Sequence, residues 1–342
     1  FFPKNRLPYL DKMKIVNFKD TAARLAAIRT GKLDRNIQPG LNPTEIEALD
    51  KTNPEIKYGP AWALGQYATV RADKKPWNDI RVRTAAMLAV NHEELVEFFN
   101  GHADYPGFPA KSSAGYPNWL SKEQLDKIAP DIARLYEYHP DEANKLLDEA
   151  GYPRGSDGVR FETSLLSHTA ANENYQAFMG YLEEVGIRVN HDMMDNAAHY
   201  AAIHSADGPS DRYSGLGAHC HGGTGIGFLP VMVWNAPWRP YYAMGKVQDT
   251  PAAAKLKKLW DGVNLTTDPD EFKQLYQDIH LFWMKELWFL DFGAVNTYMT
   301  WQPWVKGMDG QTGYATGRYH FTKYLWIDAG LKQKLSGRAA NQ

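Results

Sequence analysis

The side chains best suited to chemistry lie in one short run, His219-Cys220-His221, with His199 and His204 nearby. If the run is a strand, both outer imidazoles point to one face and the thiol to the other, because side chains alternate along a strand. The imidazoles could then share one metal ion, whose third ligand would come from elsewhere. Neither Cys-x-x-Cys nor His-Glu-x-x-His spacing occurs. The pattern therefore favours polar contacts or hydrogen bonding to a ligand over metal binding.

Thiol chemistry at Cys220 is an alternative interpretation of the same run. Neighbouring strand residues diverge, so neither His219 nor His221 can readily serve as the base, and that role would pass to His199 or His204. A metal- or thiol-dependent hydrolase centred on His219-Cys220-His221 thus stays open as an alternative to ligand binding.

Aromatic side chains gather further along the chain, at Trp234, Trp238, Tyr241 and Tyr242. Flat aromatic faces stack on sugar rings and on other apolar ligand surfaces. We therefore expect Trp234 and Trp238 to contact a ligand, and an oligosaccharide or an aromatic solute would suit them. The alternative is that the rings pack their own loop against the protein.

Composition excludes several classes of protein. The 342 residues, 44% of them hydrophobic, can bury a large core and form one large or two ordinary domains. The 38 basic and 40 acidic residues nearly cancel, so no overall field recruits nucleic acid. No run approaches the roughly 18 consecutive apolar residues of a membrane span. The single cysteine rules out an intramolecular disulfide.

The elements that position these residues are predicted to alternate between strand and helix, which favours an α/β fold with crossover connections. Capping residues and glycine stops set the helix ends. The predicted strands are 9–18, 63–71, 161–167 and 187–193, and the predicted helices are 22–30, 42–49, 81–100, 140–150, 172–185 and a long helix from 269. The rest of 36–60 is predicted to be irregular, and 289–305 to be strand and loop.

Two motifs resemble the oligopeptide- and dipeptide-binding family of ABC-transporter solute-binding proteins, the family 5 extracellular solute-binding proteins. One is residues 75–93, with Pro76-Trp77-Asn78-Asp79 opening a helix, and the other is residues 138–153. Three shorter matches keep the family's order, at 7–11, 185–187 and 303–307. The resemblance corresponds to the C-terminal two-thirds of such a protein, so we expect the signal peptide and early strands to be missing.

The resemblance implies an α/β, two-lobed fold of the periplasmic-binding-protein type (type II), apparently lacking its N-terminal part. Residues 1–64 would be part of lobe I, 65–289 would form lobe II, and 290–342 would return to lobe I, with hinges near Gly65 and Phe289. The expected function is capture of a small solute in the cleft between the lobes. An enzyme activity, a cofactor and a metal are not expected.

Partners and location follow from the same resemblance. The partners would be a solute (a peptide, an oligosaccharide or similar), an ABC-transporter permease and the missing N-terminal segment of the same protein, with no nucleic acid. The protein would be periplasmic, or extracellular and tethered to a membrane. A scaffold reused as a receptor or assembly subunit is a further alternative.

One departure from the family concerns the solute. Peptide-binding members carry an acidic residue that neutralises the peptide amine, whereas the corresponding residues 217–223 contain no carboxylate. A buried, unpaired ammonium is costly, so either Asp207 or Asp211 serves or the solute is not a peptide. Arranged along the chain, the expected solute contacts are Trp62, Gln66, Tyr67, His219, His221, Trp234 and Trp238.

Overall fold

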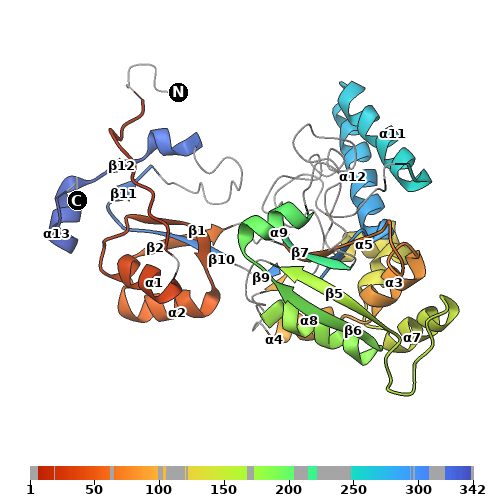
Figure 1. The fold of residues 1–342 in the computed structure, drawn as a ribbon. Helices are drawn as coiled ribbons and strands as arrows, with labels where there is room; N and C mark the ends of the chain where they lie inside the picture. Colours follow the sequence, from red (N-terminus) through yellow and green to blue (C-terminus); the bar gives the residue numbers. More distant parts are fainter. Residues whose placement is uncertain are drawn as a thin grey trace. The chain divides into compact units, whose positions relative to one another are not determined.

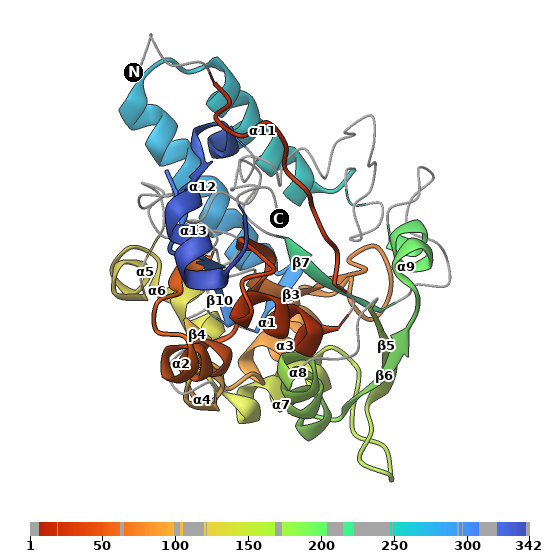
Figure 2. The same cartoon turned by 90° about the vertical axis from the view of Figure 1, so that its left-hand side faces the viewer.

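The computed structural model divides the chain into two compact units. Figures 1 and 2 draw their helices and strands from two sides. Unit 1 comprises residues 1–63 and 295–342, and unit 2 comprises residues 64–294. Unit 2 is therefore one continuous insert between the two parts of unit 1. The structure describes residues 7–18, 20–61, 65–98, 103–104, 120, 122–167, 173–203, 215–221, 247, 249–292, 294–295, 297–307 and 320–339.

A five-stranded sheet, in the order β6-β5-β7-β3-β8, forms the centre of unit 2. Strand β5 pairs in parallel with β6 and β7, whereas β3 is antiparallel to both β7 and β8. Four of its strands therefore run in one direction and β3 runs against them. The strands are β3 (Gly65–Val70), β5 (Phe161–Ser167), β6 (Ile187–Met193), β7 (Leu216–His221) and β8 (Phe289–Asp291). The short strands β4 (Ala103–Asp104) and β9 (Ala294–Val295) pair separately.

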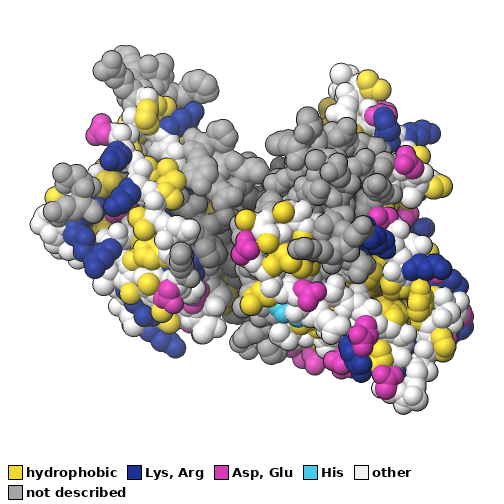
Figure 3. All heavy atoms as spheres, viewed as in Figure 1, with side chains coloured by type: hydrophobic (Ala, Val, Ile, Leu, Met, Phe, Trp, Pro, Cys, Tyr) yellow, Lys and Arg dark blue, Asp and Glu magenta, His cyan; other side chains and the backbone are white. Residues whose placement is uncertain are grey.

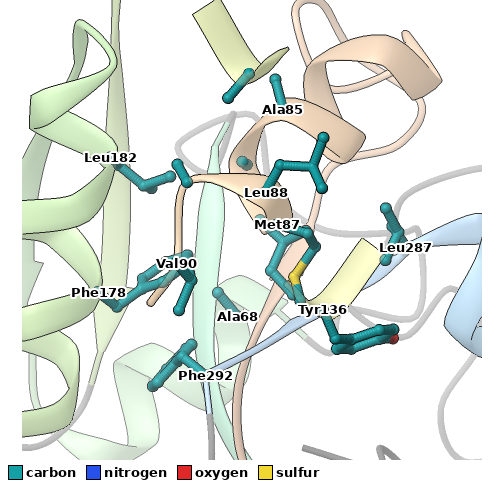
Figure 4. Close-up of a cluster of buried hydrophobic side chains, with 14 of the residues drawn as sticks. Ala68, Ala85, Met87, Leu88, Val90, Tyr136, Phe178, Leu182, Leu287 and Phe292 are labelled. Carbon is teal, nitrogen blue, oxygen red and sulfur yellow. The ribbon is translucent and has the colours of Figure 1, made fainter. Parts of the chain in front are cut away.

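Helices contribute buried side chains to two apolar clusters of unit 2. In the first cluster, Phe178 of α8 stacks on Phe292 with ring centroids 4.5 Å apart (Figure 4). In the second, Tyr67 and Phe289 pack with Trp283 of α12. Because strand residues alternate between the clusters, the sheet lies between two helix layers. The helices are α3 (Ile80–Leu88), α4 (His92–Phe98), α5 (Lys122–Ile128), α6 (Pro130–Ala133), α7 (Pro140–Glu149), α8 (Glu173–Glu184), α9 (Asn196–Ile203), α11 (Pro251–Leu265) and α12 (Pro269–Glu286).

Capping residues explain where these helices begin. The Asp79 carboxylate accepts from Arg81 N at 2.9 Å at the start of α3, and Asp268 accepts from two backbone amides at the start of α12. The single helix predicted over 81–100 is wrong, because α3 ends at Leu88 and α4 begins at His92. Asn91 Oδ1 accepts from Glu94 N at 3.1 Å, so a second cap interrupts the predicted helix.

Unit 1 is built on a three-stranded antiparallel sheet in the order β1-β10-β2. Its main apolar cluster is Ile28, Leu41, Ile46, Leu49 and Ile56, and a second one is Trp304, Val305 and Leu325. The elements of this unit are α1 (Thr21–Arg29), β1 (Arg35–Leu41), α2 (Pro43–Thr52), β2 (Lys57–Ala61), β10 (Thr297–Trp301), β11 (Val305–Lys306), β12 (Trp326–Ile327) and α13 (Ala329–Ser336).

A polar contact joins both parts of unit 1. The Trp304 Nε1 group donates to Asp34 Oδ1 at 2.7 Å, and Lys332 Nζ lies 3.0 Å from the same carboxylate. Gly31 ends α1 with φ +64°, and a Cβ there would lie 3.0 Å from the Trp304 ring. Asp34 therefore ties residues near the start of the chain to residues near its end.

Two sequence predictions for unit 1 are wrong. Residues 9–18 form no strand, because the structure describes no strand that pairs with them, and residues 11–17 are all exposed. Conversely, 36–60 is not irregular outside its helix, because β1 and β2 both pair with β10, more than 200 residues away. Phe289, expected near a hinge, lies in β8 of unit 2. The predicted lobe boundaries stay a prediction.

Candidate functional site

Strand directions bring several polar positions of unit 2 to one edge of its sheet. Strands β5, β6, β7 and β8 all end there, and β3, which is antiparallel to its neighbours, begins there. We call this the carboxyl edge, and define it by Gly65, Ser167, Met193, His221 and Asp291. In α/β sheets, ligands bind outside the carboxyl ends of the strands. The carboxyl edge is therefore the candidate functional site.

The register between β3 and β7 relates two groups of predicted site residues. Tyr67 pairs with His219, Gln66 with Cys220, and Gly65 with His221. Because directly paired positions share a face and successive positions alternate, positions 67, 219 and 221 lie on one face, and 66 and 220 on the other. The strand needed for the predicted separation of His219 and His221 from Cys220 is thus present as β7.

Tyr67 is a core residue in the structure. Its side chain is 0% exposed, and its ring meets that of Phe289 edge to face, with centroids 5.1 Å apart. The neighbouring Thr69 Oγ1 donates to Gly217 O at 3.1 Å, which ties β3 to β7 in the same region. Tyr67 therefore stabilises the sheet beside the carboxyl edge, and its role as a solute contact stays a prediction.

Of the other predicted contacts, the structure describes the backbone of three and no part of the remaining three. Gln66, His219 and His221 are placed by their backbone in β3 and β7, but their side chains are outside the described set. Trp62, Trp234 and Trp238 lie outside the described residues, as do Asp207 and Asp211. Of the seven residues expected to contact solute, four are thus placed on adjacent strands and three are not placed.

Sequence reasoning missed a hydrogen-bonded pair at this edge. Ser167, the last residue of β5, is 1% exposed, and its Oγ lies 2.7 Å from His191 Nε2 on β6. The polar residue that closes the apolar pair Leu165-Leu166 was the available signal, because polar groups at strand ends are positioned for ligands. This pair places a hydroxyl and an imidazole at the carboxyl edge.

Asp291 is a second residue that the sequence did not single out. It ends β8, is 3% exposed and pairs with Tyr67 across the ladder, so a buried carboxyl group belongs to the carboxyl edge. The backbone carbonyl of Asp291 accepts from His92 Nε2 at 3.0 Å. Burial lowers the pKa of His92 to about 4, so this ring is neutral at pH 7 and holds the end of β8 in place.

Metal chemistry finds no support among the residues that the structure describes. Within that set no three His, Cys, Asp or Glu side chains form a group able to hold a metal ion. The side chains of His219, Cys220 and His221 lie outside it, so the hydrolase alternative stays a prediction. In the described part of the chain, no helix has the length and apolar character needed to cross a membrane.

Comparison with protein families gives one match over most of the chain. Residues 2–214 match the model described as "Bacterial extracellular solute-binding proteins, family 5 Middle". The glutathione-binding protein GsiB of Salmonella typhi is 25% identical over an alignment of 297 residues, and the match covers 82% of this chain and 52% of the relative. The chain thus spans about half the length of that relative.

Solved structures share the fold at lower sequence identity. The periplasmic binding protein DppA of Helicobacter pylori, in complex with peptide STSA, matches with a TM-score of 0.64 and 18% identity, over 91% of this chain and 56% of that one. The binding protein AgaA of A. tumefaciens, in complex with agropinic acid, matches with a TM-score of 0.68 and 20% identity, over 91% and 59%. These likenesses confirm the predicted α/β fold of the type II periplasmic-binding-protein kind.

Proposed function

This chain belongs to the bacterial extracellular solute-binding proteins of family 5, and from that membership we propose that it captures a small solute for an ABC importer. The solute would be a peptide or another small polar molecule. The names of the relatives support this range, since they include a glutathione-binding protein, a peptide complex and an agropinic acid complex. The chain would bind without converting its solute.

The observation that carries the proposal is the pairing of β3 with β7 at the carboxyl edge. This register puts Gln66 and Tyr67 directly across from Cys220 and His219. Imidazole and amide side chains donate and accept hydrogen bonds, which suits a polar solute better than an apolar one. We propose that Gln66, Tyr67, His219 and His221 contact the solute, and that Trp62, Trp234 and Trp238 complete the site.

Asp291 bears on whether that solute is a peptide. The run 217–223 has no carboxylate, but the buried Asp291 lies on β8, which is separated from β7 by β3 alone. Its position shares a face with 67 and 219. If Asp291 neutralises a peptide amine, peptides bind and Asp291→Asn weakens them. If it does not, either Asp207 or Asp211 neutralises the amine, or the solute is an oligosaccharide or another molecule without a free amine.

Native mass spectrometry of the gently purified protein, beside the same sample denatured, is the first test. A small organic mass lost on denaturation supports solute capture and identifies the solute. Isothermal titration with peptide STSA, glutathione and agropinic acid then ranks the chemical classes. A stoichiometric metal mass, or cleavage of the added peptide, would instead support the hydrolase alternative.

A pair of histidine variants locates the site. We expect His219→Ala to weaken binding of the identified solute by about tenfold or more, the loss of roughly one polar contact. The matched control is His139→Ala, because His139 is a half-exposed residue of unit 2 that interacts with Glu137 at 3.0 Å, outside the carboxyl edge. Equal affinities for both variants would exclude His219 from the site.

The proposed partners and location follow from the family. Family 5 proteins are described as extracellular, and we propose that this chain works outside the cytoplasm, tethered to a membrane or free in the periplasm. Its partners would be a transporter permease and an additional polypeptide corresponding to the length that the relatives have and this chain does not span. Co-purification with the permease in solute-loaded but not solute-free form tests the first partner.

A further inference from the structure

The five-stranded sheet of unit 2 has two edge strands that differ in how far they are covered. Strand β8, at one edge, has all three of its residues buried. Strand β6, at the other edge, lies beside β5 (Figure 1) and has three exposed residues, Asn190, Asp192 and Met193. The side chain of Met193 is 62% exposed. An uncovered edge strand can pair with a strand of another chain.

The backbone of β6 bonds to β5 at every second residue and points outward at the residues between. Met194 N donates to Ser167 O at 3.0 Å, so the even-numbered residues of β6 direct their amide and carbonyl groups toward β5. Val189, His191 and Met193 therefore direct theirs away from the sheet. Among the residues that the structure describes, none forms a hydrogen bond with these outward backbone groups. The outer edge of β6 is thus free to form a ladder.

An antiparallel pair of two β6 strands has one register in which opposite charges meet. If the twofold axis passes beside Asn190, Arg188 of each copy lies opposite Asp192 of the other. These are non-hydrogen-bonded positions, at which opposite side chains are closest. The outward groups of Val189 and His191 then bond to each other across the axis. In the registers centred on Val189 or on His191, neither charged residue lies opposite a charge of the other sign.

Both charged side chains are placed for that contact. The side chain of Arg188 is 40% exposed, and its Nη1 lies 3.2 Å from Glu162 Oε1 on β5. Asp192 is exposed, and it has no ion-pair partner among the residues that the structure describes. Pairing places Arg188 between Glu162 and Asp192 of the second copy, so a carboxylate without a cation gains one. This charge complementarity favours a second copy over a partner of one charge sign.

We propose that two copies of the chain pair their β6 strands antiparallel about a twofold axis at Asn190, which joins their two sheets into one. Strand β6 has seven residues, so the interface is small and the dimer dissociates at about micromolar concentrations or above. The carboxyl edges of the two copies point in opposite directions, because antiparallel strands end at opposite sides. The pairing uses no residue that we expect to contact the solute, so it stands apart from the proposed function.

Analytical ultracentrifugation of the complete chain over a range of concentrations tests for the dimer. We expect the mass to rise from one chain to two, with a dissociation constant of about 1 mM or tighter. The same transition should slow hydrogen exchange at the amides of Val189 and His191 by at least about tenfold. The amides of Asn190 and Asp192 point toward β5 and should change little. A one-chain mass at a protein concentration of about 1 mM would overturn the proposal.

Charge reversals at two positions test the register. Asp192→Arg puts Arg188 opposite a second cation, and Arg188→Asp puts Asp192 opposite a second carboxylate. Each variant alone is therefore expected to dimerise at least about tenfold more weakly. An equimolar mixture restores both opposite-charge pairs and is expected to dimerise like the unchanged chain. Asp261→Arg, the same reversal at a 50% exposed position of α11, is the control and should not weaken the dimer.

Val189→Pro separates the backbone contact from the charges. It removes an outward amide but none of the amides directed at β5, so it is expected to abolish dimerisation in a chain that still melts cooperatively. Dimerisation that survives both Val189→Pro and Asp192→Arg contradicts pairing at β6. Slow exchange at Val189 and His191 in a chain of single mass also contradicts the second copy, because it assigns the edge to a different extended segment.

Discussion

Unit 2 encloses its apolar residues, whereas unit 1 leaves many of its own at the surface. The described part of unit 2 has buried clusters of 29 and 12 hydrophobic residues, and that of unit 1 has clusters of five and three. Among the described residues, nine of the fifteen exposed large hydrophobic side chains nevertheless belong to unit 1, the smaller unit. Figure 3 shows apolar side chains at the surface of unit 1 between its lysines and arginines. Unit 2 thus contains most of the stabilising core, and unit 1 presents surface suited to association.

The largest expected effect tests whether unit 2 depends on its core. Phe178→Ala removes a fully buried ring stacked on Phe292, so we expect it to lower the free energy of unfolding of unit 2 by about 3–5 kcal/mol. Urea denaturation followed by hydrogen exchange at β5 measures this loss. Phe272→Ala is the control, because Phe272 is 40% exposed on α12, and its effect should stay below about 1 kcal/mol. Equal losses would contradict the assignment of this core.

A pH effect confined to unit 2 is expected next. Burial lowers the pKa of His92 from 6.5 to about 4. Between these two pH values the imidazole is protonated in the unfolded chain and neutral in the folded chain. The contribution is fully present above about pH 6.5 and is lost as the pH falls toward 4, by at most about 3 kcal/mol. Urea unfolding across this range measures the slope. His92→Gln should flatten this slope.

A polar contact gives the corresponding test in unit 1. Asp34→Ala removes the acceptor of Trp304 Nε1 and the partner of Lys332, whose side chain is 2% exposed. Because Asp34 itself is 41% exposed and partly screened by water, we expect a loss of about 2 kcal/mol rather than more. Hydrogen exchange of β10 amides would report it. Asp50→Ala, which removes an exposed bond from Tyr58 at 3.0 Å, should change those amides far less.

The smallest expected effect sharpens the contrast with Phe178. Ile15→Lys replaces an apolar side chain of unit 1 that is 65% exposed, so the free energy of unfolding of the chain alone should change by less than about 0.5 kcal/mol. Denaturation of the purified variant beside the unchanged chain measures the difference. A loss as large as that of Phe178→Ala would show that Ile15 belongs to a core after all.

The same contrast explains how far the fold could be predicted from sequence. In unit 2, β5 and β6 have the predicted bounds of 161–167 and 187–193, because their apolar runs and the helix between them are local signals. In unit 1, residues 11–18 have strand-like residues without a strand partner, and β1 and β2 find theirs at β10. Whether extended residues form a strand depends on distant pairing, which local pattern does not contain.

The candidate site shows the same limit. Strand alternation predicted that His219 and His221 would share a face if their run were a strand, and β7 supplies that strand. The pairing of His219 with Tyr67 could not be predicted, because register between strands 150 residues apart is fixed by tertiary packing. Asp291 was missed for that reason, since only the sheet order brings the end of β8 to the edge at which β5 ends.

The insertion of unit 2 between the two parts of unit 1 sets an order of synthesis and folding. All of unit 2 has left the ribosome soon after residue 294, and it can form its sheet from contiguous chain. Unit 1 has to wait, because β1 pairs Arg35 with Trp301 and Asp34 meets Lys332. Until these partners are synthesised, the early residues of unit 1 stay unpaired and accessible to chaperones and proteases. If unit 2 folds first, its two ends are held in fixed positions. The two parts of unit 1 then pair across a shorter effective loop than an unfolded insert would give.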